Sequence, residues 1–290
     1  MAAPANTPKK ALSSLTLRII SAAVLIPIVV AAVYAGHPAW DLLVILFAGV
    51  MAWEWSSIVA RRFSPTDDLR RRAIAGTTII TVVFIAALAF LPGVMHDRHS
   101  VVKAAVCVPI LAVAFYCRRA VQTAPFWFGL GQIYVFIPCL AIIRLRADPT
   151  VGLQQIFWIV ALVIAADTGA YIAGRGIGGP KLAPRISPNK TWAGLGGAVV
   201  SAAIVGAITA FLMDLAPVAI LTVVSGALGV VAQAGDLAES AFKRHFGVKD
   251  ASNIIPGHGG ALDRVDGLIA VAAAVASINY LIGSSVLTWL

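Results

Sequence analysis

The chain has 290 residues, of which 60% are hydrophobic and only 12% are charged, with a formal net charge of +9. Soluble domains carry about 25% charged residues, and the mean hydropathy here is +0.90, so a soluble globular protein is excluded. The basic residues are divided among short segments instead of forming one basic face, which argues against nucleic acid as a partner. The composition indicates a polytopic membrane protein.

The apolar runs are continuous, which favours membrane helices over the alternating strands of a β-barrel. We expect an all-α polytopic integral membrane protein with about nine transmembrane helices. Residues 1–17 are predicted to form a flexible cytoplasmic N-terminus, and the run after Arg18 to be a retained anchor, not a cleaved signal peptide. The other expected spans lie near residues 40–60, 73–92, 101–117, 125–143, 153–173, 193–213, 217–235 and 268–288.

Basic residues predict the orientation of these spans. With a cytoplasmic N-terminus, nearly all of the 22 Lys and Arg residues lie on the cytoplasmic side, as the positive-inside rule requires. The exceptions are Arg98, Lys103, Arg144 and Arg146. We divide the chain into N-terminal transmembrane helices, residues 18–150, and a C-terminal catalytic region, residues 151–290, with cytoplasmic loops at residues 174–192 and 236–266.

The first of these loops, residues 174–192, contains the groups that a polyphosphate needs. Lys181 and Lys190 supply ammonium groups, and Ser187 and Thr191 supply hydroxyls, in a backbone rich in Gly and Pro. Its "GRGIGG" matches a dinucleotide fingerprint only in its letters, because it follows a membrane span and not a strand. Its "PNKT" lacks the upstream glycine of a P-loop. Taken alone, the loop fits either phosphate binding or a basic loop without a ligand.

The second loop, residues 236–266, favours a ligand. Asp236 ends one expected span, and Asp263 and Asp266 begin the next, three residues apart and so on one face of a helix. Clustered aspartates repel one another without a cation, and Mg²⁺ prefers a few carboxylates together with water and substrate phosphates. We therefore predict that these three aspartates bind Mg²⁺; one cation or two would fit.

Basic residues and glycines surround the three aspartates. The side chains predicted to neutralise phosphate oxygens are Lys243, Arg244, Lys249 and Arg264. Within "GHGG", Gly259 and Gly260 allow a ligand to approach the backbone closely. Two loops suited to phosphate on the same side of the membrane indicate metal-assisted chemistry on a nucleotide or a lipid phosphate.

The segment "SAFKRHFGVKDASNIIPGHGGALDRVD", residues 240–266, resembles the signature of the phosphatidate cytidylyltransferases, also called CDP-diacylglycerol synthases. It fills essentially every fixed position, although Ala261 is smaller than the usual apolar residue. "LAPRISPNKTWAG" resembles the second polar segment of that family, and the resemblance is specific over about residues 165–267. It implies a homodimeric enzyme of the cell inner membrane, with its active site on the cytoplasmic side, which makes CDP-diacylglycerol and pyrophosphate from CTP and phosphatidic acid with Mg²⁺.

The resemblance also implies roles for individual residues. The metal ligands are Asp236, Asp263 and Asp266, and the whole catalytic set is Asp236, Lys243, Arg244, Asp263, Arg264 and Asp266. The substrate-binding set is Lys181, Ser187, Lys190, Thr191, Lys249, His258, Gly259 and Gly260. An ionised phosphate monoester is already a nucleophile, so His258 is expected to order the loop or donate to a phosphate and not to act as a base. Catalysis then reduces to positioning and charge neutralisation.

Other functions fit parts of the pattern. A polyprenol kinase would have a similar nucleotide segment, and a polyprenol would replace phosphatidate as its substrate. A transporter would use Asp167 and Glu54, the two carboxylates within spans. Transport sites usually lie near the bilayer midplane, however, and Glu54 is close to the interface. A CDP-alcohol phosphotransferase is disfavoured, because "DRVDGLIAVAA" lacks the Ala-Arg and the later aspartate of that class.

Overall fold

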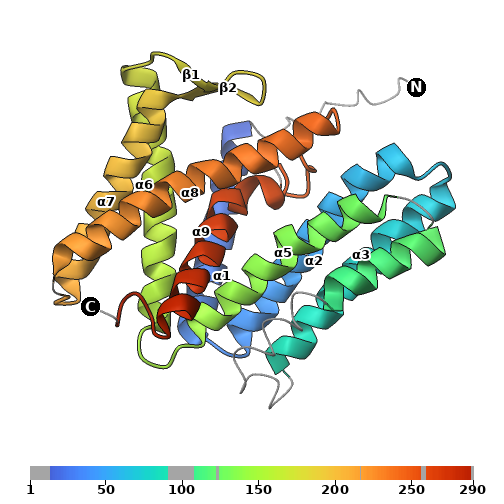
Figure 1. The fold of residues 1–290 in the computed structure, drawn as a ribbon, viewed down its shortest axis with the longest axis horizontal. Coiled ribbons are helices and arrows are strands. Elements are labelled where there is room, and N and C mark those ends of the chain that lie inside the picture. Colours follow the sequence, from blue (N-terminus) through green and yellow to red (C-terminus); the bar gives the residue numbers. More distant parts are fainter. Residues whose placement is uncertain (1–13, 91–107, 122–123, 216, 256–258, 289–290) are drawn as a thin grey trace, which may run out of the picture.

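A computed structural model of the chain describes residues 14–90, 108–121, 124–215, 217–255 and 259–288. Most of them are helical (Figure 1). The long helices are α1 (Ser14–Ala35), α2 (Ala39–Phe63), α3 (Asp67–Phe90), α5 (Pro125–Arg146), α6 (Gly152–Gly176), α7 (Trp192–Leu212), α8 (Val218–His245) and α9 (Leu262–Ile282). Residues 108–116 are also helical and lead into a π-helical turn, Cys117–Val121.

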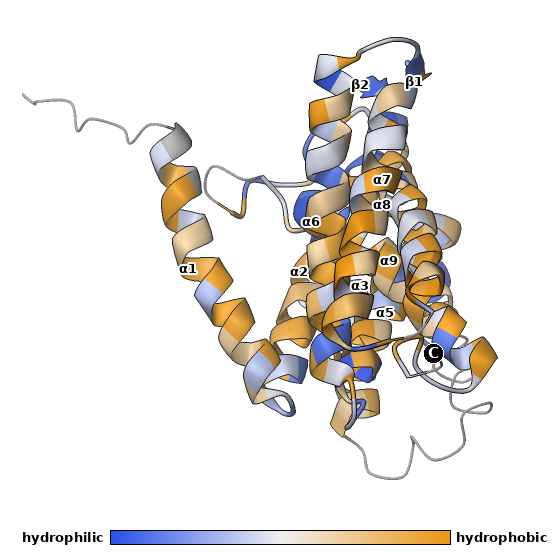
Figure 2. Ribbon diagram, turned by 90° about the vertical axis from the view of Figure 1, so that its left-hand side faces the viewer, coloured by the Kyte–Doolittle hydropathy of each residue, from blue (hydrophilic) through white to orange (hydrophobic). Residues whose placement is uncertain are grey.

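Seven of the described helices, α2, α3 and α5 to α9, are long and apolar enough to cross a membrane. This confirms the all-α polytopic class. The first expected span corresponds to α1, whose apolar part is the shorter stretch Ile19–Ala35. In Figure 2, α1 stands apart from the other helices. The span expected at residues 101–117 lies partly outside the described residues, so the count of nine and the cytoplasmic N-terminus stay predictions.

Helices α6, α7 and α8 approach one another closely because small residues line their contacts. A Cβ atom on Gly169 of α6 would lie 2.5 Å from the carbonyl oxygen of Gly197 on α7. A Cβ atom on Gly206 of α7 would lie 2.5 Å from the carbonyl oxygen of Leu221 on α8. Such close backbone contacts supply the packing energy that the hydrophobic effect cannot supply within lipid.

Trp55 of α2 joins the N-terminal helices to the C-terminal ones. Its ring stacks on Phe242 of α8, with the ring centroids 3.6 Å apart. Its Nε1 donates to the carbonyl oxygen of Trp127 at the start of α5, at 2.9 Å. The packing of α2, α5 and α8 is therefore fixed close to the end of α8 that carries the polar residues.

The two polar segments contain more regular structure than expected. Helix α8 continues to His245, past the expected end at residue 235, and α9 begins at Leu262, before residue 268. The extension of α8 is amphipathic: Glu239, Phe242 and Lys243 are buried, whereas Arg244 and His245 are exposed. The predicted loop of residues 236–266 is thus helical at both ends.

The other polar segment forms a hairpin between α6 and α7. Strands β1 (Lys181–Ala183) and β2 (Ser187–Thr191) pair antiparallel, with Lys181 opposite Thr191. This hairpin was not expected from the sequence. Figure 2 shows it beyond one end of the helices, on the side where α6 ends and α7 begins.

Candidate active site

The polar site lies where the last turns of α8 meet the first turns of α9. Asp236, Glu239 and Lys243 recur at helical spacing along one face of α8, and Asp263 and Asp266 are one turn apart on α9. Close helix contact brings the two faces together. A Cβ atom on Gly235 would lie 2.7 Å from the carbonyl oxygen of Asp266.

The first group of charges, which we call the Lys243 cluster, consists of Glu239, Lys243 and Asp263. The Nζ atom of Lys243 lies 2.6 Å from Oε2 of Glu239 and 2.6 Å from Oδ1 of Asp263. Lys243 is only 9% exposed and Glu239 only 2%. The attraction within a buried ion pair offsets the cost of desolvation only when the geometry is good and further hydrogen bonds are made. The short distances in this cluster therefore indicate that its three side chains are held in fixed positions.

Asp263 also orders the loop that connects α8 to α9. Its Oδ2 accepts hydrogen bonds from the backbone N–H groups of Gly260, at 2.9 Å, and Ala251, at 3.1 Å. Gly259 has a φ of +87°, and its N–H and carbonyl pair with those of Ile255 across the loop. A positive φ favours glycine, so the backbone conformation alone accounts for a glycine at position 259.

Glu54 of α2 contacts the same loop and is fully buried. Its Oε1 accepts from the N–H of Ala261 at 2.9 Å, and its Oε2 accepts from the N–H of Leu262 at 2.8 Å. The hydroxyl of Ser252 donates to the same carboxylate. The sequence indicates Glu54 only as a residue that a transporter would use. Sequence spacing gives no signal for a contact between residues so distant in the chain.

The second group, which we call the Lys190 cluster, consists of Asp167, Lys190, Gln233, Asp236 and Asp266. The Nζ atom of Lys190 lies 2.7 Å from Oδ2 of Asp236 and 3.0 Å from Oε1 of Gln233. The Nε2 of Gln233 donates to Oδ1 of Asp167 at 3.0 Å. Asp266 interacts electrostatically with Asp236, Asp167 and Lys190. This cluster opens to solvent more than the first, since the Asp236 side chain is 37% exposed.

The three aspartates predicted to bind Mg²⁺ have different partners in the structure. Asp263 belongs to the Lys243 cluster, whereas Asp236 and Asp266 belong to the Lys190 cluster. Within the described residues, no three His, Cys, Asp or Glu side chains are already arranged to hold a metal ion. The donor chemistry of the Lys190 cluster nevertheless suits a hard divalent cation, because its carboxylates outnumber its single lysine.

The remaining predicted residues lie around these clusters. Thr191 is buried and caps α7, accepting from the N–H of Gly194 at 3.0 Å. Arg244 is exposed and donates to the carbonyl oxygen of Val248. The other residues that the structure describes at this end are Lys181 and Ser187 on the hairpin, Lys249 in the loop, and Arg264 on α9. His258 lies outside the described residues.

Fold and site together define an integral membrane protein whose carboxylates and lysines are concentrated at the ends of two helices, an arrangement suited to phosphate groups. The chain belongs to the cytidylyltransferase family, whose model matches residues 16–282.

Relatives from three bacterial genera each carry the name phosphatidate cytidylyltransferase. The chain is 36% identical to that of Brucella suis biovar 1 (strain 1330), over 94% of each chain. It is 34% identical to that of Pseudomonas aeruginosa, over 92% of this chain and 97% of the relative. It is 33% identical to that of Haemophilus influenzae, over 87% of this chain and 94% of the relative. The similarity thus extends well beyond the segment 165–267 that carries the sequence resemblance.

Proposed function

We propose that the chain is an enzyme of phospholipid biosynthesis that transfers a cytidylyl group from CTP to phosphatidic acid, giving CDP-diacylglycerol and pyrophosphate. Membership of the cytidylyltransferase family supports the reaction class, and the names of its relatives support the lipid substrate. The observation that carries the proposal is the pair of charged clusters at the junction of α8 and α9. Apart from Asp167 on α6 and Gln233 on α8, the residues of both clusters belong to the predicted polar segments, residues 174–192 and 236–266.

The proposed reaction is a direct transfer. An oxygen of the phosphatidate phosphate forms a bond to the α-phosphorus of CTP, and the bond from that phosphorus to the β-phosphate oxygen breaks, so that pyrophosphate leaves. The phosphate oxygen is already ionised, and no side chain has to remove a proton from it. The chain therefore has to hold two anions together and to stabilise the charge on the transferred group.

The chain's own cations suit that task to different degrees. Lys190 is near the surface and is balanced by carboxylates, so a phosphate can replace Asp236 as its partner. Lys243 is buried between two carboxylates and holds the loop of Asp263 in place. We assign Lys190 to substrate contact and the Lys243 cluster to positioning. The exposed Arg244, Lys249 and Arg264 remain proposed phosphate ligands, as Lys181 and Ser187 do on the hairpin.

Asp236 and Asp266 are the proposed ligands of Mg²⁺, with Asp167 beside them. When bound, the cation would supply charge neutralisation for the phosphates. The part of Asp263 in metal binding stays a prediction, because its oxygens accept hydrogen bonds from Lys243, Ala251 and Gly260. One cation or two would fit this donor set.

We further propose that this multi-pass protein lies in the cell inner membrane with the site facing the cytoplasm. CTP then enters from water, and phosphatidate enters sideways from the bilayer. The basic residues near the polar segments support this orientation through the positive-inside rule. The homodimer implied by the family resemblance stays a prediction.

The test is a direct assay of the purified protein in mild detergent. Labelled CTP and phosphatidic acid are supplied with and without Mg²⁺, and labelled lipid and pyrophosphate are measured. Mg²⁺-dependent CDP-diacylglycerol is the expected product. If folded protein makes none, a polyprenol replaces phosphatidate in a second assay, and a labelled polyprenyl phosphate from γ-labelled CTP would replace the proposal with a kinase.

A further inference from the structure

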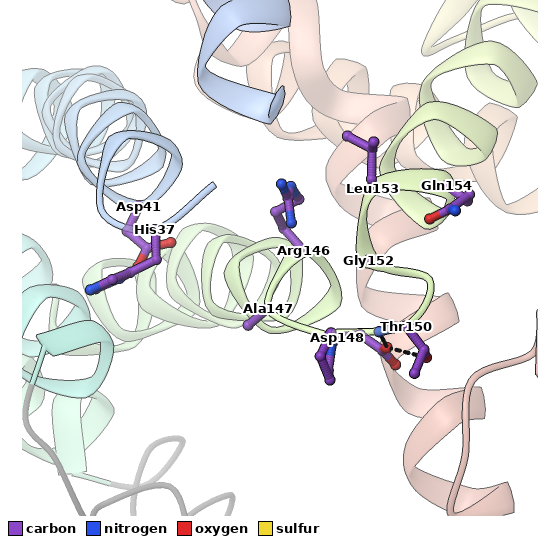
Figure 3. A pocket seen from close by; sticks show the side chains of 10 residues that line it. His37, Asp41, Arg146, Ala147, Asp148, Thr150, Gly152, Leu153 and Gln154 are labelled. Atoms are coloured by element: carbon purple, nitrogen blue, oxygen red, sulfur yellow. Dashed lines mark hydrogen bonds and ion pairs between the residues drawn. The ribbon is translucent and has the colours of Figure 1, made fainter. Parts of the chain in front are cut away.

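The end of the helices away from the active site carries a polar pocket in which the charged groups already have partners. Helix α5 runs between the two ends: Trp127 at its start packs against Phe246 beside the active site, and Arg146 is its last residue. Figure 3 shows Arg146, His37 and Asp148 around this pocket. His37 pairs with Asp41 at 2.7 Å, and Nε of Arg146 donates to a carbonyl oxygen of α1 at 2.7 Å.

A second pocket, adjoining the first, lies between α5, α9 and the turn that follows α9. Its volume is about 510 Å³, and most of its wall is apolar, including Leu140, Ala273, Ala276 and Leu281. A volume of this size is typical of ligand sites, which hold about 300–1,000 Å³. Arg144 lines the pocket two residues before the end of α5, and the ends of a membrane-spanning helix are expected to lie near the lipid head groups.

Arg144 lacks the partners that Asn279 and Asp148, two other polar residues of this pocket, have. Its Nε is buried and has no hydrogen-bond partner, and none of the ion pairs between described residues includes it. Asn279 donates to Gln155 and accepts from the N–H of Val286. Asp148 lines both pockets, but its Oδ1 accepts hydrogen bonds from residues that precede α6.

The position of Arg144 beside an apolar pocket requires an explanation. Arg144 is half-buried, and a buried donor such as its Nε costs free energy when it has no partner. The proposed orientation also puts this end of the helices where basic residues are depleted. The hydrogen bonds of Arg146 to α1 account for that residue but not for Arg144. A guanidinium binds phosphate through parallel hydrogen bonds, and basic pockets between membrane helices bind anionic lipid head groups.

We infer that Arg144 binds the phosphate of an anionic phospholipid, with an acyl chain in the apolar pocket between α5 and α9. The lipid belongs to the leaflet opposite the active site. This site is separate from the one proposed for phosphatidate, and it stands whether or not the proposed reaction is correct.

Native mass spectrometry of the full chain in detergent tests the inference, with phosphatidylglycerol titrated against phosphatidylcholine. We expect one phosphatidylglycerol to bind more tightly than the rest, and Arg144→Gln to weaken that binding about tenfold, the loss typical of one hydrogen bond to a charged group. Arg144→Lys should keep part of it. Arg71→Gln is the control, because Arg71 is an exposed arginine at the start of α3, and it should bind like the unchanged chain.

A second variant tests the apolar part of the site without touching the charge. Ala276→Phe fills the pocket between α5 and α9 and should weaken phosphatidylglycerol binding by a similar factor. Soluble glycerol phosphate should not displace the lipid; displacement would mean that a free phosphate is the ligand and would overturn the assignment. Unchanged binding in Arg144→Gln or in Ala276→Phe would also overturn it, as would an equal loss in Arg71→Gln.

Discussion

The carboxylate of Glu54 accepts a hydrogen bond from the backbone N–H of Leu262, a residue 208 positions later in the chain. The first N–H groups of a helix have no partner inside it, and the helix dipole favours a negative charge at that end. Glu54 supplies a hydrogen-bond acceptor and a negative charge at the start of α9, the helix that carries Asp263 and Asp266. A side chain of the N-terminal half of the chain thus fixes the start of the helix that carries proposed site residues.

Glu54→Gln should lower turnover about 100-fold while leaving the KM for CTP nearly unchanged. The amide keeps one acceptor but loses the charge, so the start of α9 shifts, and small displacements of reacting groups cost rate on this scale. Steady-state assays separate kcat from KM. Ser56→Ala is the matched control, because Ser56 lies on the same helix, is buried and donates to or accepts from Thr77; equal losses in both variants would contradict a positioning role.

Lys243→Met should destabilise the folded protein by about 3–5 kcal/mol, because it leaves two carboxylates buried without their cation. Unfolding in mixed micelles, followed by circular dichroism, measures the free energy of unfolding. Adding Glu239→Gln to Lys243→Met should recover part of the loss, since one of the uncompensated charges is then gone. A double variant no more stable than the single one would mean that Glu239 and Lys243 are not coupled.

The sequence predicts the helical class well because lipid imposes one rule on every span: about 20 apolar residues with all backbone groups bonded internally. Seven of the expected spans have counterparts of similar extent among the described helices. The predicted helix ends were less accurate for α8 and α9. Polar residues such as Asp236 and Lys243 suggest a loop by composition, yet the helix continues through them because α9 and α2 bury one of its faces.

The sequence predicts carboxylates and lysines at this end of the helices, but it does not show which of them become partners. Spacing within one helix brings Asp263 and Asp266 together, and the prediction placed them with Asp236. Which lysine meets which carboxylate depends on contacts between distant segments: Lys190 lies on strand β2 of the hairpin, and Asp236 lies on α8. Glu239 and Gln233 could have been found from their positions three residues from Asp236 on the same helix.

Lys190→Gln should reduce kcat/KM about 100-fold with little change in unfolding temperature. Lys190 is partly exposed and bridges Asp236 and Gln233, so its loss removes a phosphate-binding cation more than it removes packing. Arg72→Gln serves as the control, since the exposed pair of Arg72 with Asp68 on α3 contributes at most about 1 kcal/mol and lies outside the site. If Lys190→Gln kept full activity, the assignment of Lys190 to substrate contact would be wrong.

Removal of divalent cations should abolish the reaction without unfolding the protein. Asp236 is already held by Lys190, and Asp167 by Gln233, so the fold of this region does not require a metal ion. The negative charge of two bound phosphate groups, in contrast, requires a cation to neutralise it. Treatment with EDTA should remove activity, Mg²⁺ should restore it, and the unfolding temperature should stay the same. Asp266→Asn should remove activity that excess Mg²⁺ does not restore. A large fall in unfolding temperature with EDTA would instead assign the cation a structural role.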